Sequence, residues 1–127
     1  MKALCIGVND YDFAGPLDCP VNDSNDISRA LSDLGFDSEN IPNPTRSQAL
    51  DSITNFVDEA NATKVRIFYF SGHGFQIDGA NYLAMRDTVT SSELMAKGSS
   101  IALNDILDAI SVNQKTTNIV ILDACRN

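Results

Sequence analysis

Basic residues, histidine and tryptophan are all scarce in this chain. Nine lysines and arginines stand against seventeen acidic residues, which gives a net charge of −8 over 127 residues. Nucleic-acid binding depends on clustered cations that displace counterions from phosphates, so this balance argues against a nucleic-acid partner. Tryptophan is absent and histidine occurs once, at position 73. Any imidazole chemistry therefore rests on His73.

Long apolar runs are also missing. No stretch approaches the roughly eighteen consecutive apolar residues of a membrane-spanning helix, and the apolar run after Lys2 is too short for a signal peptide. The three cysteines are an odd number, and Cys5 lies inside an apolar run, which is typical of a small buried thiol. We therefore expect a soluble chain in a reducing, cytoplasmic compartment, with no membrane partner and no disulfide framework.

The chain has enough apolar residues for one core. A hydrophobic fraction of 43% over 127 residues predicts a single domain spanning residues 1–127. Dense apolar or β-branched runs predict strands at residues 2–8, 65–70 and 119–122, with a short one at 81–85. Helical spacing of apolar residues predicts a first helix that carries Ile27, Ala30, Leu31 and Leu34, a second over 46–60, and a third through Leu103–Ile110.

Several local signals bound these elements. Asp23 or Ser24 is available as the N-cap of the first helix, and Gly35 is its expected stop. Thr45 and Gln48 have the spacing of a capping box in front of the second helix. Residues 86–100 are polar and rich in hydroxyls, which predicts a mobile loop. The order strand, helix, helix, strand, helix, strand indicates an α/β fold with a largely parallel sheet and helices on both faces.

Chemistry-bearing residues follow two of the predicted strands. Residues 71–74 (Ser-Gly-His-Gly) come directly after the strand at 65–70, and residues 123–127 (Asp-Ala-Cys-Arg-Asn) come after the last strand. Functional residues of open α/β sheets gather at the carboxyl ends of the strands, so His73 and Cys125 are expected to meet if these strands are neighbours. A thiolate nucleophile needs a nearby base, and a glycine N–H beside it can stabilise an oxyanion. Acyl transfer is the reaction class that this pair favours.

These two motifs, with residues 78–83 (Asp-Gly-Ala-Asn-Tyr-Leu), resemble the large-subunit segment of caspase-like peptidases. The similarity is to the bacterial metacaspase-like, or orthocaspase, branch, since Asp123 stands where true caspases have glutamine. The first strand and residues 17–34 also resemble the family, so the likeness covers essentially the whole chain. It implies a three-layer α/β/α sandwich with a mostly parallel sheet, and a cysteine-type endopeptidase.

The resemblance also implies a role for each site residue. It assigns Cys125 as the nucleophile and His73 as the general base and acid, with the oxyanion held by the backbone N–H groups of Gly74 and Cys125. Asp23 and Asp123 match the carboxylates that line the substrate pocket of metacaspase-like enzymes. A guanidinium fits a pair of carboxylates, so the expected substrates carry Arg or Lys before the scissile bond.

Simpler interpretations stand beside these roles. In the simpler interpretation, Asp23 only caps a helix and Asp123 only caps N–H groups at a strand end, and neither residue binds substrate. Arg126 either steadies the thiolate or is a surface residue, and we favour the surface. Cys19, in the turn before a proline, is expected to be structural or incidental.

No cofactor is expected. Many metacaspases require calcium, which needs six to eight oxygen ligands. Asp78 and Asp87 are nine residues apart and form no tight acidic cluster, so the sequence provides no clear calcium site. No Cys/His spacing resembles a zinc site.

The sequence also predicts that one side of the substrate cleft comes from outside these 127 residues. Family members continue past the nucleophile into a small subunit that adds strands, and a sheet that ends at the 119–122 strand exposes an unpaired apolar edge. We therefore expect the chain to act with a small subunit or a downstream segment of the same precursor. Lys97–Gly98, in the predicted loop, is a candidate for a cut after a basic residue. The alternative function is a catalytically silent caspase-fold module for interaction or regulation.

Overall fold

The computed structural model describes residues 1–58, 64–112 and 115–125. Its strands are β1 (Lys2–Gly7), β2 (Asp37–Pro42), β3 (Val65–Ile77), β4 (Ala80–Leu83), β5 (Ile101–Ala102) and β6 (Thr117–Cys125). Its helices are α1 (Pro20–Asp33), α2 (Arg46–Asp58), α3 (Glu93–Ser99) and α4 (Leu103–Ile110).

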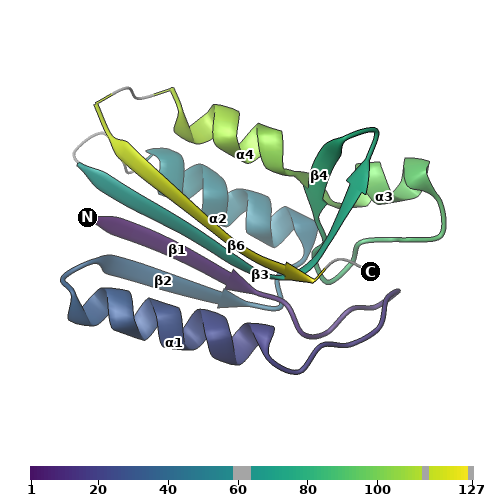
Figure 1. The fold of residues 1–127 in the computed structure, drawn as a ribbon, viewed down its shortest axis with the longest axis horizontal. Coiled ribbons are helices and arrows are strands. Elements are labelled where there is room, and N and C mark those ends of the chain that lie inside the picture. Colours follow the sequence, from purple (N-terminus) through teal and green to yellow (C-terminus); the bar gives the residue numbers. More distant parts are fainter. Residues whose placement is uncertain (59–63, 113–114, 126–127) are drawn as a thin grey trace.

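The strands form one mixed sheet. Four of them, in the order β2-β1-β3-β6, are parallel, whereas β3 pairs with β4, and β4 with β5, in antiparallel fashion. Figure 1 shows α1 on one side of the parallel strands and α2 and α4 on the other. The long strand β3 bends out of the parallel part toward β4, so it belongs to both parts of the sheet.

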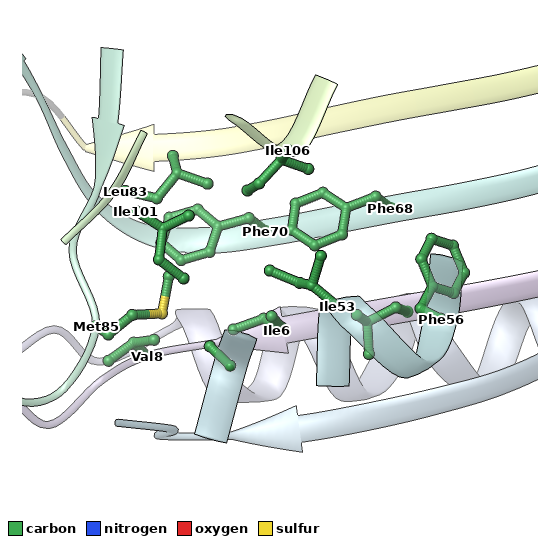
Figure 2. Packing of buried hydrophobic residues seen from close by; sticks show 12 residues of the cluster. Ile6, Val8, Ile53, Phe56, Phe68, Phe70, Leu83, Met85, Ile101 and Ile106 are labelled. Carbon is green, nitrogen blue, oxygen red and sulfur yellow. The ribbon is translucent and has the colours of Figure 1, made fainter. Parts of the chain in front are cut away.

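Alternation along β1 explains the two covered faces. Leu4 and Ile6 belong to the main apolar cluster, which they share with Ile53 and Phe56 of α2. Figure 2 shows this cluster between the sheet and the helix, with Phe68 and Phe70 of β3 at its centre. Successive side chains of a strand point to opposite faces, and the intervening residues of β1 face α1. The sheet is therefore buried on both faces along β1, as a parallel strand requires.

The face against α1 is packed with small polar side chains. The buried Ser24 donates its hydroxyl to Asn40 Oδ1 at 2.9 Å, and the hydroxyls of Ser28 and Ser38 lie 2.6 Å apart. Gly7 lies so close to Ser24 that an added Cβ would meet its hydroxyl oxygen. The helix therefore approaches the sheet closely by means of serines, and of the apolar stripe Ile27, Ala30, Leu31 and Leu34 only Ile27 and Leu31 are half-buried. Leu34, part of that stripe, is 71% exposed.

The start of α1 differs from its prediction. The N-cap is Cys19, which makes no side-chain capping hydrogen bond, and Pro20 occupies the first turn. Proline has no N–H to satisfy and its φ is already helical, so it begins the helix without a capping side chain. The proposal of Asp23 or Ser24 as N-cap was therefore wrong: both lie inside the helix.

Strand β2 was absent from the predicted order. Its sequence, Asp-Ser-Glu-Asn-Ile-Pro, carries a single large aliphatic residue and gives no apolar signal. It forms a strand because it lies at the sheet edge beside β1, in register from Lys2–Asp37 to Gly7–Pro42. Lys2 Nζ and Asp37 Oδ2 also form an ion pair, at 3.1 Å. Backbone pairing here overrides weak local propensity.

The predicted capping box is confirmed at the start of α2. Thr45 N–H donates to Gln48 Oε1 at 3.0 Å, and Gln48 N–H donates to Thr45 Oγ1 at 3.2 Å. The structure places α2 over Arg46–Asp58, and residues 59–60 of the predicted helix lie outside the described residues.

Residues 86–100 are not one irregular loop. They contain α3, whose first turn is capped by Ser92 Oγ, which accepts from Met95 N–H at 3.2 Å. Lys97 lies in this helix and its Nζ is 3.5 Å from Asp78 Oδ2. Because proteases bind extended chain, a cut at Lys97–Gly98 would first require α3 to unfold.

Candidate active site

His73 lies within β3, not in a turn after it. Ser71, Gly72 and His73 continue the parallel pairing with β6, and Gly74 begins the antiparallel pairing with β4. The predicted strand end is therefore a change of partner inside a longer strand. This location holds the backbone of the histidine on both sides.

Two residues of the loop after β1 fix the imidazole. Tyr11 Oη accepts a hydrogen bond from the backbone N–H of His73 at 2.7 Å, and the centroids of the two side-chain rings lie 4.6 Å apart. His73 Nε2 lies 2.8 Å from the carbonyl oxygen of Gly15. A carbonyl can only accept, so in this contact Nε2 carries the proton and, in the neutral ring, Nδ1 keeps its lone pair. The geometry leaves Nδ1 as the basic nitrogen.

Tyr11 and Gly15 were not identified from the sequence. Residues 10–19 gave no periodicity, and a backbone carbonyl as a histidine partner has no signature in residue type. Two near neighbours in sequence, Asn9 and Leu17, pair through Leu17 N–H and Asn9 O at 2.9 Å, which closes the loop. The loop is thus tied back on itself next to the histidine.

Cys125 is placed by its backbone as the register partner of His73. Strands β3 and β6 are parallel neighbours, in register from Val65–Thr117 to His73–Cys125. Neighbouring strands lie about 4.8 Å apart, so the two backbones are adjacent at this position. Arg126, next in the motif, lies outside the described residues.

The glycines on either side of His73 fill places with no room for a side chain. A Cβ at Gly72 would lie 2.6 Å from Tyr11 Oη and 2.9 Å from Phe70 Cζ. A Cβ at Gly74 would lie 3.0 Å from the Cβ of Ala124, the residue before Cys125. Close packing of neighbouring side chains, and not an unusual φ, is what favours glycine at these two positions.

The charges of Asp23 and Asp123 both act on the hydroxyl of Tyr69. Burial raises the pKa of Tyr69, a hydrogen bond with Ser71 lowers it, and the charges of Asp123 and Asp23 raise it further. Asp123 is exposed and is the register partner of Ser71, whereas Asp23 is half-buried in the first turn of α1. Two carboxylates from distant parts of the chain therefore share one electrostatic neighbourhood.

A cavity of about 590 Å³ lies beside His73, which forms part of its wall. We call it the His73 cavity. Its wall includes His73 and Gly15, the continuation of β3 through Ile77, and the segment from Ala84 to Ala96. The lining is mainly apolar and hydroxylated.

Metal ligands do not gather in the described part of the chain. Within residues 1–58, 64–112 and 115–125, no group of three His, Cys, Asp or Glu side chains is arranged to hold an ion. Asp87 instead accepts from Arg46 N–H at 2.8 Å, and Asp78 is paired with Lys97. No helix in those residues is long and apolar enough to cross a membrane.

The other two cysteines are free. Cys5 is buried beneath α1, and this burial raises the pKa of its thiol, against the lowering effect of hydrogen bonds with Ser38 and Ser28. A thiol kept in its neutral form is a poor nucleophile, so Cys5 is a packing residue. Cys19 is exposed at the start of α1.

Comparison with known proteins decides the family, because the caspase domain matches residues 1–127. The chain belongs to the caspase domain family. The resemblance drawn from the two motifs is therefore confirmed. Caspase-domain proteins of this family are cysteine peptidases, and the chain shares the fold on which that chemistry is built.

Two curated relatives are fungal metacaspases. Metacaspase-1 of Candida albicans and metacaspase-1 of Lodderomyces elongisporus are each 34% identical over 88 residues, which is 61% of this chain. The match spans about a fifth (20%) of each relative's length.

Solved structures show the same fold. A Geobacter sulfurreducens protein superposes with a TM-score of 0.77 at 19% identity, covering 98% of this chain and 50% of its own. The Drosophila initiator caspase Dronc gives a TM-score of 0.76 at 16% identity, covering 95% of this chain and 47% of its own. The expected caspase-like α/β/α sandwich is therefore confirmed, with an antiparallel extension through β4 and β5.

Proposed function

We propose that this caspase domain provides the catalytic pair and the specificity carboxylates of a cysteine endopeptidase that cleaves after Arg or Lys. The observation that carries the proposal is the register of β3 and β6, which sets His73 opposite Cys125. Family membership supports the reaction class, and the charges of Asp23 and Asp123, which both raise the pKa of Tyr69, support the basic preference.

The chemistry follows from the state of the imidazole. With Nε2–H held by Gly15 O, Nδ1 accepts the thiol proton of Cys125, and the resulting thiolate attacks the carbonyl carbon of the substrate. The oxyanion that forms is stabilised by the N–H groups of Gly74 and Cys125. The imidazolium then gives its proton to the leaving amine, and water hydrolyses the thioester with His73 again as base.

The two carboxylates bind the basic side chain before the scissile bond. A guanidinium makes charge-assisted hydrogen bonds with carboxylates, each contributing about 1.5–3 kcal/mol. A substrate aspartate would be repelled by the same pair, so the preference separates this site from one selective for acidic residues.

The proposal includes a small subunit or a downstream segment that covers β6. Among the described strands, β6 pairs with β3 alone, and its residues Ile119 and Ile121 are 43% and 41% exposed. An apolar strand edge of this kind favours pairing with a further strand. Such a strand would add the second wall of the substrate cleft.

The test is a panel of fluorogenic peptides that end in Arg, Lys or Asp, cleaved by the full protein that contains this domain. We expect Arg and Lys peptides to be cleaved, Asp peptides to be left intact, and Cys125→Ala to remove the activity. Equal signals from wild type and Cys125→Ala would refute the endopeptidase assignment and favour a silent interaction module.

The carboxylates have their own test with a matched control. Asp23→Asn and Asp123→Asn should each lower kcat/KM for Arg peptides by about 10- to 100-fold, the equivalent of one charge-assisted hydrogen bond. Asp26→Asn removes an exposed carboxylate from the same helix and should change kcat/KM less than twofold. A similar loss in all three variants would show a general charge effect and not a pocket.

A further inference from the structure

The His73 cavity is not used by any step described above. It has a volume of about 590 Å³ and is lined by His73 itself, so whatever fills it lies against the catalytic imidazole. Its position relative to Asp123 and Cys125 follows from the register in which β3 pairs with β6. This inference rests on the proposed endopeptidase function.

Three successive levels along β3 order the site. Ser71 is level with Asp123, His73 is level with Cys125, and residues 74–77 form one wall of the cavity. Along β3, Asp123 and this wall of the cavity therefore lie on opposite sides of the catalytic level. A peptide that places its basic residue near Asp123 reaches the cavity with the residues that follow the scissile bond.

Proton transfer from His73 to the leaving amine requires the peptide to lie in this same orientation. His73 protonates the leaving amine, which belongs to the first residue after the scissile bond. That residue must lie over the imidazole when the bond breaks. Its side chain then has the cavity directly beside it, because His73 and Gly15, which holds Nε2, both belong to the wall.

The lining indicates the chemical class of the occupant. The wall offers aliphatic, aromatic and hydroxyl groups, from residues that include Pro16, Leu17, Phe75, Ile77, Thr88 and Thr90. Of the described residues in the lining, Glu93 is the one acidic side chain, and it disfavours an acidic occupant. We propose that the His73 cavity is the binding pocket for an aliphatic side chain on the first residue of the leaving peptide.

The test uses internally quenched peptides Ala-Ala-Arg-X-Ala-Ala, in which X is Gly, Ala, Leu or Glu, with the full protein. Burial of an aliphatic side chain in the transition state raises kcat/KM, so the Leu peptide should exceed the Gly peptide by about tenfold, with Ala between them. The Glu peptide should be the poorest of the four.

A filled cavity provides the matched variant. Ala14 lies half-buried in the wall, and Ala14→Phe should reduce the Leu-to-Gly ratio of kcat/KM from about tenfold to about twofold or less. Val112→Phe adds the same ring at a position that is 83% exposed and outside the cavity, and should leave the ratio unchanged. The ratio is measured within each variant, so a partly unfolded preparation does not alter it.

The outcomes separate this pocket from the proposed function. Cys125-dependent cleavage after Arg at equal kcat/KM for Gly, Ala and Leu would overturn the pocket and leave the endopeptidase standing. A preference for Leu that persists in Ala14→Phe would place the aliphatic side chain elsewhere and also overturn it. Absence of any Cys125-dependent cleavage would overturn both.

Discussion

Removing the guanidinium of Arg66 should strongly destabilise the domain. Arg66 is 1% exposed at the start of β3. Its Nε donates to Asn118 Oδ1 of β6 at 3.0 Å, Nη1 to Val57 O at 3.3 Å and Nη2 to Ile110 O at 2.9 Å. Val57 and Ile110 lie at the ends of α2 and α4, where helix dipoles concentrate negative partial charge. One side chain thus joins two strands and two helices.

The expected magnitude follows from these contacts. Hydrogen bonds to a charged group contribute about 1.5–3 kcal/mol each, but the cost of burying the guanidinium offsets part of that sum. In Arg66→Met, a side chain of similar length loses all three bonds, and we expect the free energy of unfolding to fall by about 3 kcal/mol. For a domain of this size that corresponds to a Tm lower by roughly 10 °C.

Urea and thermal unfolding followed by circular dichroism measure the effect. Arg66→Lys retains the charge but not the fork of donors, so about half of the loss should remain. Arg29→Met, at an exposed position of α1, is the matched control and should stay within about 0.5 kcal/mol of wild type. A double-mutant cycle with Asn118→Ala should give a coupling energy of about 1 kcal/mol. A free energy of unfolding for Arg66→Met within about 1 kcal/mol of wild type would contradict this role of Arg66.

Three further predictions concern the site and its support. Tyr11→Phe removes the acceptor of the backbone N–H of His73, so kcat should fall about fivefold to tenfold with little change in KM. Steady-state kinetics that show an unchanged kcat would contradict a positioning role. Gly72→Ala should lower both stability and kcat, because its Cβ would lie 2.6 Å from Tyr11 Oη. The double variant with Tyr11→Phe should recover part of the stability. No recovery would show that this contact is not the cause. Burial raises the pKa of Cys5 and Tyr69 above their ordinary values of 9.0 and 10.0, so the folded protein holds these protons more tightly than the unfolded chain. The resulting contribution to stability is complete below the ordinary values and is lost as pH rises through the folded-state pKa values. Urea unfolding between pH 8 and 11 should show this fall, less steeply in Cys5→Ala and Tyr69→Phe; a flat profile in wild type would refute it.

Strong local signals predicted most elements of the fold. The β-branched and aromatic run at 65–70 is a strand, and the Thr45–Gln48 capping box begins a helix, because both signals act within a few residues. Strand β2 has no such signal and exists because β1 supplies its partners. The polar segment at 86–100 contains α3, which is capped locally by Ser92, although its composition predicted a loop.

Candidate site residues were recognisable by type, but their setting was not. His73, Cys125, Asp23 and Asp123 came from motifs and from a family resemblance that the caspase domain match supports. That His73 lies within a strand that changes partners could not be read from its glycine neighbours, which looked like a turn. The roles of all four residues remain predictions for the experiments above.

The amino-acid sequence alone determined which segments are apolar enough to be buried and which residues have side chains suited to acyl transfer. Those properties belong to single residues and short windows. Only the tertiary structure decided that β3 and β6 are neighbours, that Gly15 O faces His73 Nε2, and that a cavity opens beside the imidazole. Each of these depends on segments far apart in the chain, whose contacts form only when the core brings them together.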